Sequence, residues 1–375
     1  MKKLLLGTTG LVGAAFIASA AAAETPKVTV GGFIDFQAGY ADDDLDAGLR
    51  DYGFRNDTEV SLRVDGKSDA GLGYGAVIDL EADVTGDADG EGVNAARTYV
   101  YLDGNFGRFE LGSNEGAAET MAVDAADIAR ATGGIDGDWR FFTGTGNTTP
   151  GGAGYITTPS LPVDHGAVTA IGSETTENNN KITYYSPRMS GFQLGLSYAP
   201  DATDRGQTVT RSDVGTSAGD IFDLALAWEG DYENVGLGLS GAYKWGDGDS
   251  TVEDLGAWNL GALVEFSGLQ LAASYADWDD SLQANGSSLD ENDYYTLGAA
   301  YDFGPFGASV TWLDSSYETA AGDNEFENLV FGADYKLAPG LTPYAELSLF
   351  EFDAAAAGGT DNDGTVFLVG TQLAF

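Results

Sequence analysis

The sequence predicts an all-β protein whose strands close into a transmembrane, antiparallel, up-and-down β-barrel of about sixteen strands. Three observations predict this fold: an export signal at the start of the chain, apolar and polar residues that alternate with a period of two, and connections that are alternately short and long. No run of about eighteen apolar residues follows the export signal, so no membrane-spanning helix is expected.

The first part of the chain has the layout of a secretory signal peptide. Lys2 and Lys3 precede an apolar stretch over residues 4–18, and the small residues Ala21 and Ala23 come directly before Glu24. This order of segments predicts cleavage before Glu24. Residues 1–23 are therefore expected to direct export, and residues 24–375 to form a single barrel domain. A retained amino-terminal anchor is the alternative interpretation.

The composition excludes several classes of protein. The 375 residues include no cysteine, so no disulfide framework, thiol nucleophile or cysteine-based zinc site is available. The formal net charge is −42, and removal of Lys2 and Lys3 makes it two units more negative. Such a polyanion repels nucleic acid, which is therefore not expected as a partner, and concentrates cations along any channel that it lines.

Alternation of apolar with polar or small residues is the signal for strands. It is clearest in residues 28–40, 60–64, 192–198, 222–228 and 235–245. A soluble sandwich would show the same alternation, with its apolar face turned to a core. Aromatic residues at the segment ends favour a barrel instead, because they match membrane-interface girdles: Tyr40, Tyr198, Trp228, Trp245, Trp258, Tyr275, Tyr301, Phe303, Trp312, Tyr317 and Tyr335.

The connections support the same interpretation. Tight ones are expected at residues 104–105, 267–268, 304–305 and 338–340, and long acidic loops at 42–50, 85–94, 201–220, 277–293 and 354–363. Short turns at one end and long loops at the other are typical of membrane barrels. The final apolar segment, which ends at Phe375, is expected to pair with the first strand, so that no sheet edge remains open.

An even number of strands follows from counting the alternating segments. They are expected to begin near residues 28, 52, 72, 96, 106, 180, 191, 220, 232, 255, 268, 293, 305, 325, 341 and 364. About sixteen strands leave a water-filled lumen, whereas about eight would be filled by side chains. The interior is therefore expected to be a channel.

One connection, from residue 113 to residue 179, lacks convincing alternation. A structureless stretch of this length in a compact domain is expected to be a functional lid, plug or binding loop. Its residues 117–131 have a composition that suits a short helix. Two further strands near 154–159 or 167–171 are the alternative.

The chain resembles the general porins of Gram-negative bacteria, in particular their alphaproteobacterial branch. The resemblance covers nearly all of the sequence after the export signal, and its most specific parts are residues 28–36 (VTVGGFIDF), 97–112 (RTYVYLDGNFGRFELG), 180–192 (NKITYYSPRMSGF) and the terminal Phe375. It implies a homotrimer of sixteen-stranded barrels in the outer membrane, in contact with its lipid and lipopolysaccharide. It also implies an inward-folded constriction loop after the fifth strand, and a role for Phe375 in the signal read by the barrel-assembly machinery.

Charged residues are the candidates for the pore lining. The resemblance implies acidic residues on the loop, across the pore from basic residues on the wall. The loop acids are Glu115, Glu119, Asp124, Asp127, Asp136 and Asp138, and the arginines whose parity points them into the lumen are Arg55, Arg63, Arg97 and Arg108. Ringed acids favour cations, so moderate cation selectivity is expected. The alternative is that individual acids are solvated residues without a role in permeation.

Three other features suggest chemistry but do not support it. Residues 236–241 (GLGLSG) match a dinucleotide-binding fingerprint by letter, yet lie inside an alternating segment without the required helix. The acidic clusters at 87–91, 247–249 and 361–363 lack the spacing of a dedicated calcium loop, so only adventitious Ca²⁺ is expected and no cofactor. His165 has no nucleophile in a recognisable context, which makes an enzyme the least supported class.

A passive diffusion channel for small hydrophilic solutes, located in the outer membrane after export through the periplasm, is therefore the expected function. A substrate-specific channel or receptor, with a saturable site in the inward loop, is the alternative.

Overall fold

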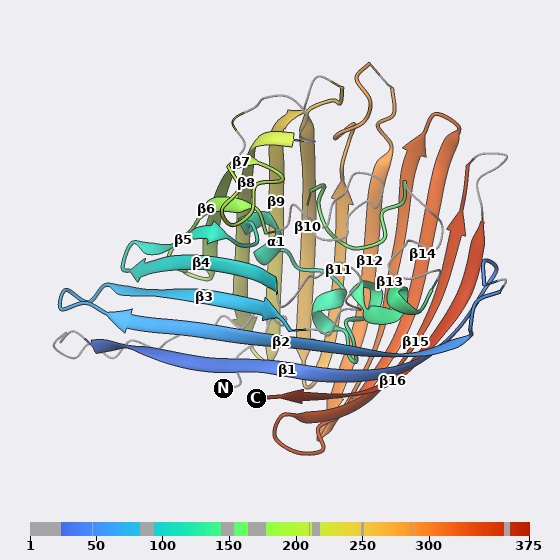
Figure 1. Ribbon diagram of the computed structural model, residues 1–375, viewed down its shortest axis with the longest axis horizontal. Helices are drawn as coiled ribbons and strands as arrows, with labels where there is room; N and C mark the ends of the chain where they lie inside the picture. The colour runs from blue at the N-terminus through green and yellow to red at the C-terminus, as the bar shows by residue number, and fades with distance from the viewer. Residues whose placement is uncertain are drawn as a thin grey trace.

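The computed structural model describes residues 24–46, 48–82, 94–143, 154–163, 178–209, 211, 218–248, 251–286, 288–355 and 361–375. Within these ranges, sixteen antiparallel strands follow one another around a closed barrel (Figure 1). The strands are β1 (Glu24–Asp43), β2 (Tyr52–Lys67), β3 (Gly73–Glu81), β4 (Asn94–Gly104), β5 (Gly107–Ser113), β6 (Asn180–Tyr185), β7 (Phe192–Asp201), β8 (Ala218–Tyr232), β9 (Val235–Gly248), β10 (Leu255–Phe266), β11 (Leu269–Asp277), β12 (Asn292–Phe303), β13 (Phe306–Thr319), β14 (Gly322–Tyr335), β15 (Leu341–Asp353) and β16 (Asn362–Ala374). The predicted fold is confirmed, and each predicted start lies within four residues of an observed one.

The alternation in sequence becomes an apolar outer face and a polar inner face. Leu196, Leu224 and Tyr243 lie directly beside one another on β7, β8 and β9, and all three side chains are exposed on the outside. Asp223, which precedes Leu224 in β8, is buried on the inner side of the barrel. Because exposed apolar area costs roughly 25 cal/mol per Å² in water, an outer band of this kind is suited to lipid.

Aromatic rings gather near both ends of the strands. At the end with short turns, Phe306 lies 5.4 Å from Phe303 and 4.5 Å from Tyr335, measured between ring centroids. At the opposite end, the Phe222 ring lies 5.3 Å from that of Trp245. Tyr317 does not belong to these bands: it packs against buried residues inside the barrel, because it shares the inward parity of its neighbours on β13.

The four tight connections all lie at one end of the barrel, as predicted. Between β10 and β11 the turn consists of Ser267 (φ +51°) and Gly268 (φ +87°). Positive φ at both central residues matches the right-handed twist of the flanking strands. The long connections lie at the opposite end.

The barrel closes between its first and last strands. β1 pairs with β16 from Phe33–Ala374 to Asp43–Gly364, and the two strands run side by side in Figure 1. Beyond the ladder, Phe375 donates its backbone N–H to the Gly32 oxygen at 3.0 Å, and the Gly32 N–H returns a bond of 3.2 Å. We call this β1–β16 ladder the closure seam.

Within the described ranges, the connection between β5 and β6 lies inside the barrel (Figure 1). Its described part holds α1 (Ala117–Thr120) and the 3₁₀ turns η1 (Ala126–Ile128), η2 (Gly134–Asp136) and η3 (Asp138–Phe142). The helix is much shorter than the predicted range 117–131, because backbone N–H groups beyond it bond to wall side chains instead of to the preceding turn. Within the described ranges, no helix is long and apolar enough to cross a membrane. No strand forms at residues 154–159, and residues 167–171 lie outside the described ranges.

Candidate functional site

The inward loop, which we define as the described residues between β5 and β6, follows the inner wall around much of the ring. Its helix α1 contacts β6 to β9, η1 contacts β11 and β12, η2 contacts β13 to β15, and η3 contacts β1 and β16. We call β6–β16 together with β1 the covered wall. The remaining strands β2–β5 form the open wall, which carries the predicted arginines.

Hydroxyl groups on the covered wall hold the loop backbone. Four loop N–H groups donate to inward-facing serine and threonine oxygens: Ala117 to Ser197 (2.8 Å), Ala125 to Thr296 (3.2 Å), Arg130 to Ser309 (2.9 Å) and Ile135 to Thr311 (3.2 Å). Each bond satisfies a buried backbone donor that no regular helix or sheet would satisfy. The loop is thus fixed to the wall at intervals along its length.

Small residues make room for the loop on the same wall. Ala117 and Ala118 of α1 belong to one buried cluster with Ala225, Ala242 and Ala257 of the wall. A Cβ at Gly261 would overlap the carbonyl oxygen of Val123. The small inward face of β9 is therefore partly covered by the loop at Ala242.

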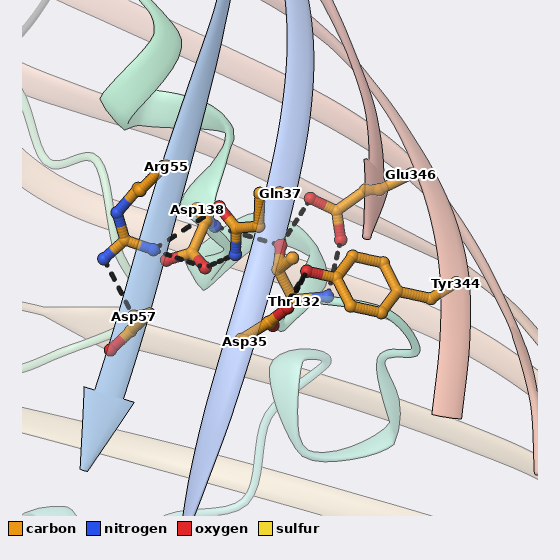
Figure 2. A network of polar contacts seen from close by, with 8 residues as sticks. All are labelled: Asp35, Gln37, Arg55, Asp57, Thr132, Asp138, Tyr344 and Glu346. Carbon is orange, nitrogen blue, oxygen red and sulfur yellow. Dashed lines mark hydrogen bonds and ion pairs between the residues drawn. The ribbon is translucent and has the colours of Figure 1, made fainter. Parts of the chain in front are cut away.

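The carboxyl-terminal part of the loop reaches the open wall through Asp138. Asp138 Oδ2 forms an ion pair with Arg55 Nη1 at 2.9 Å and accepts a hydrogen bond from Gln37 (Figure 2). Arg55 also pairs with Asp57 at 3.1 Å. Burial raises the pKa of Asp138 above its ordinary value even though Arg55 opposes that rise. This acid and this base therefore touch each other instead of facing each other across the pore.

The amino-terminal part of the loop makes a similar contact. Arg97 Nε bonds to Asp79 Oδ2 on β3 at 3.0 Å, and its Nη1 pairs with Glu115 of the loop at 2.5 Å. Two of the four predicted arginines thus link the loop to the open wall.

The other two predicted arginines pair within the wall. Arg63 bonds to Asp65 at 3.1 Å and Arg108 to Glu110 at 2.5 Å. Both guanidinium groups lie over the ring of Tyr101, with Cζ 5.6 and 4.0 Å from its centroid. They lie toward the short turns, away from the loop acids.

The remaining loop acids lie along the covered wall. Asp127 Oδ2 accepts the Asp124 N–H at 2.9 Å, and Asp124 Oδ1 accepts the Ala126 N–H at 2.6 Å. Burial raises the pKa of Asp127 to about 6, and burial together with the Asp127 charge raises that of Asp124 well above its ordinary value. Glu119 lies in α1 and Asp136 in η2. Their role in permeation stays a prediction.

A buried ion pair that was not predicted from the sequence lies behind the start of the loop. Lys244 Nζ contacts Asp223 Oδ1 at 3.0 Å, and both side chains are only 3% exposed. Asp223 Oδ2 in turn accepts the Ala118 N–H at 3.4 Å. A Cβ at Gly116 would overlap this same oxygen, so any larger residue there would displace the buried Asp223 carboxylate.

The missed anchors share one signal in the sequence. Ser197, Thr296, Ser309 and Thr311 are all polar residues at inward-facing positions of their strands. Parity alone shows that such a residue points inward. It does not distinguish a side chain that bonds the loop from one that meets water.

The arrangement suits attraction of ions more than bond chemistry. Carboxylates line the loop and the open wall, and within the described residues no group of three or more His, Cys, Asp or Glu side chains is placed to hold a metal. His165, the acidic segment 87–91 and the export signal 1–23 lie outside the described ranges.

Comparisons with known proteins agree with this architecture. Residues 8–355 match the family model described as Gram-negative porin. Outer membrane porin protein 32 of Delftia acidovorans is 28% identical over 381 residues, covering 99% of this chain and 95% of its own length. An uncharacterized protein of Rickettsia felis is 27% identical over 342 residues, covering 74% of this chain and 76% of its own. Among solved structures, the anion-selective porin from Comamonas acidovorans superimposes with a TM-score of 0.62 at 22% identity, covering 94% of this chain and all of that one.

The chain belongs to the Gram-negative porin family. It is an outer-membrane β-barrel channel with sixteen strands, as its closed topology and its relatives show together. The short turns accordingly mark the periplasmic end, and the long loops the outer end.

Proposed function

We propose that this protein is a passive diffusion channel for small hydrophilic solutes with moderate cation selectivity. The observation that carries the proposal is the excess of carboxylates on both surfaces that bound the lumen. On the inward parity of β2–β5, five basic residues face seven acidic ones. The described part of the inward loop adds six acids and only two arginines.

The free energy that this selectivity requires is small. A tenfold preference for cations corresponds to about 1.4 kcal/mol. Charges a few ångströms from a permeating ion in a partly solvated site interact by more than this before salt screening. The porin of Comamonas acidovorans is named as anion-selective. The selectivity of this chain depends on its own lining, and here the lining is acidic.

Passive diffusion is supported by the scale of the barrel and by the position of the loop. Sixteen strands enclose an aqueous lumen, and the loop, fixed along one wall, reduces its width. Solutes would then be sorted mainly by size. No cofactor is part of this proposal, and bound Ca²⁺ would be adventitious.

Liposome swelling with a series of uncharged sugars tests the passive mechanism. Permeation rates are expected to fall steadily with solute size and to rise in proportion to concentration. Saturation of the rate, or block of single-channel current by micromolar solute, would instead favour the alternative of a substrate-specific channel with a site in the inward loop.

We further propose a homotrimer, exported by means of residues 1–23 and inserted with Phe375 as part of the signal for the barrel-assembly machinery. The apolar outer face would contact lipid, lipopolysaccharide and neighbouring copies. Phe375 supports this role because its side chain is exposed while its backbone is bonded to β1. Replacing it in Phe375→Ala should reduce insertion in cells without preventing refolding in detergent.

A further inference from the structure

The tip of the inward loop lies over the closure seam. Its 3₁₀ turn η3 contacts both β1 and β16, the two strands that join the ends of the chain into a ring. Polar side chains at the tip bond to β15 on one side of the seam and to β1 and β2 on the other (Figure 2). One short segment therefore connects strands that are far apart in the sequence.

On the β15 side, the contact is made by Glu346. This side chain is 1% exposed and accepts two hydrogen bonds from Thr132, one from the backbone N–H at 3.1 Å and one from the hydroxyl at 2.6 Å. The Thr132 hydroxyl oxygen also accepts the backbone N–H of Asp138 at 3.0 Å. One hydroxyl thus joins the wall to the residue that reaches the opposite side.

On the β1 and β2 side, the contact is made by Asp138. Its carboxylate receives hydrogen bonds from Gln37, which is fully buried, and from Arg55. Since Arg55 Nη1 also lies 3.4 Å from Gln37 Oε1, the three side chains form one connected unit.

Apolar contacts follow the same line. The Trp139 ring stacks on Phe350 of β15 with centroids 5.3 Å apart. It belongs to a buried cluster that includes Val366 and Leu368 of β16 and Ala41 of β1. The loop tip therefore covers the seam with a continuous polar and apolar surface.

We propose that Thr132 and Asp138 form an internal clasp that ties β15 to β1 and β2 and so couples docking of the inward loop to closure of the barrel. Closing the ring joins the most distant parts of the chain, and this contact carries the largest loop-closure entropy. A segment that bonds to both sides of the seam stabilises the closed ring at this point. Thr132 acts as a positioning residue. Its hydroxyl oxygen accepts the Asp138 N–H, and this bond fixes the Asp138 backbone so that the carboxylate lies against Arg55.

Amide hydrogen exchange of the refolded full-length protein in detergent tests the clasp. The matched variants are Thr132→Val and Thr296→Val, since each removes one hydroxyl that bonds the loop, at the seam and at β12 respectively. Thr132→Val should accelerate exchange in residues 33–43 and 364–374 roughly tenfold, the effect of losing a hydrogen bond to a charged group. Exchange in the β8–β9 ladder should not change. Thr296→Val should leave the seam as protected as in the parent.

Two further variants separate the clasp from a general loss of stability. Thr132→Ser keeps the hydroxyl and should restore protection at the seam. Asp138→Asn keeps the side-chain shape but loses the ion pair to Arg55, and should accelerate seam exchange in the same direction even if Thr132→Val does not refold.

The proposal is overturned if seam exchange is unchanged in both Thr132→Val and Asp138→Asn, or if Thr296→Val accelerates it equally. These results do not depend on conduction, so they leave the proposed channel function to be judged separately.

Discussion

The covered wall and the open wall have the same strand geometry but differ in what their inward residues do. On the covered wall many of these residues are small or carry hydroxyl groups, such as Ala225, Ala257 and Thr296, and they are buried. On the open wall they are charged and only partly covered, as Arg63 and Asp65 are. The inward-facing polar residues of a strand therefore do one of two things: they form hydrogen bonds with the backbone of the loop, or they are solvated.

The difference is also energetic. Hydrogen bonds from loop N–H groups to buried hydroxyls contribute about 1 kcal/mol each, and leaving such a donor without a partner costs more. An exposed ion pair within the open wall, such as Arg63–Asp65, contributes between about 0 and 1 kcal/mol. The covered wall thus fixes the loop, whereas the open wall mainly sets the electrostatic field of the lumen.

The largest effect on stability is expected where the covered wall leaves no space for a side chain between itself and the loop. Gly261→Ala introduces a methyl group that overlaps the Val123 carbonyl oxygen, so the loop backbone must shift. We expect a loss of about 1–3 kcal/mol of stability, as for other overpacked sites, together with a changed single-channel conductance. The midpoint of heat-dependent migration in detergent gels and bilayer recordings measure the two quantities.

Gly238→Ala is the matched control for this prediction. Gly238 also lies in an inward position, but its Cβ would meet only the Leu263 Cβ at 3.5 Å, an ordinary contact. This variant should keep the parent conductance and stability. Equal effects of the two substitutions would contradict the assignment of the loop to this wall.

A smaller effect is expected from the arginines of the open wall. Arg97→Gln removes the partner of Asp79 and Glu115, whose side chains are 11% and 15% exposed. We expect a loss of about 2 kcal/mol, below the value for a fully buried pair because of the residual solvent contact. Cation preference, measured by the reversal potential, should increase because one positive charge is lost.

Arg63→Gln provides the comparison on the same wall. Arg63 is 36% exposed and pairs with Asp65 on its own strand. Its removal should increase cation preference to a similar extent while stability changes by less than about 1 kcal/mol. A stability loss as large as that of Arg97→Gln would show that the contact of Arg97 with Glu115 of the loop stabilises the protein no more than an ion pair within the wall.

The smallest effect is a dependence on pH at the loop. Burial raises the pKa of Asp127 from 3.8 to about 6 in the docked loop. Because the docked loop binds this proton more tightly than a released loop would, docking gains stability as pH falls from about 6 toward 3.8. Limited proteolysis of the loop should therefore be slower at pH 5 than at pH 7, and cation preference should be lower. The step near pH 6 should be absent in Asp127→Asn.

Much of the barrel could be predicted from the sequence, since the physical signal is local. Alternation within β7 or β8 identifies a strand without knowledge of its neighbours, and turns such as Ser267–Gly268 are defined by residues adjacent in the chain. The inward loop was recognised for the same reason, by its lack of alternation.

The anchors of the loop could not be predicted, because they join residues far apart in sequence. The residues next to Ser197 in the sequence do not indicate that its hydroxyl accepts a hydrogen bond from the Ala117 N–H. Those next to Glu346 likewise do not indicate that its carboxylate accepts one from the Thr132 N–H. The predicted arginines were placed on the inward face by parity, yet only their tertiary contacts distinguish Arg55 and Arg97, which bond the loop, from Arg63 and Arg108.

The reversal potential of the purified protein in a planar bilayer, under a tenfold gradient of potassium chloride at pH 7, tests the central claim most directly. If the inward-facing polar residues and the acidic loop surround a water-filled lumen, the sign of the potential will show a preference for cations. The permeability ratio of cation to anion will be at most about ten. A potential of the opposite sign, or the absence of any ion-conducting step, would contradict it.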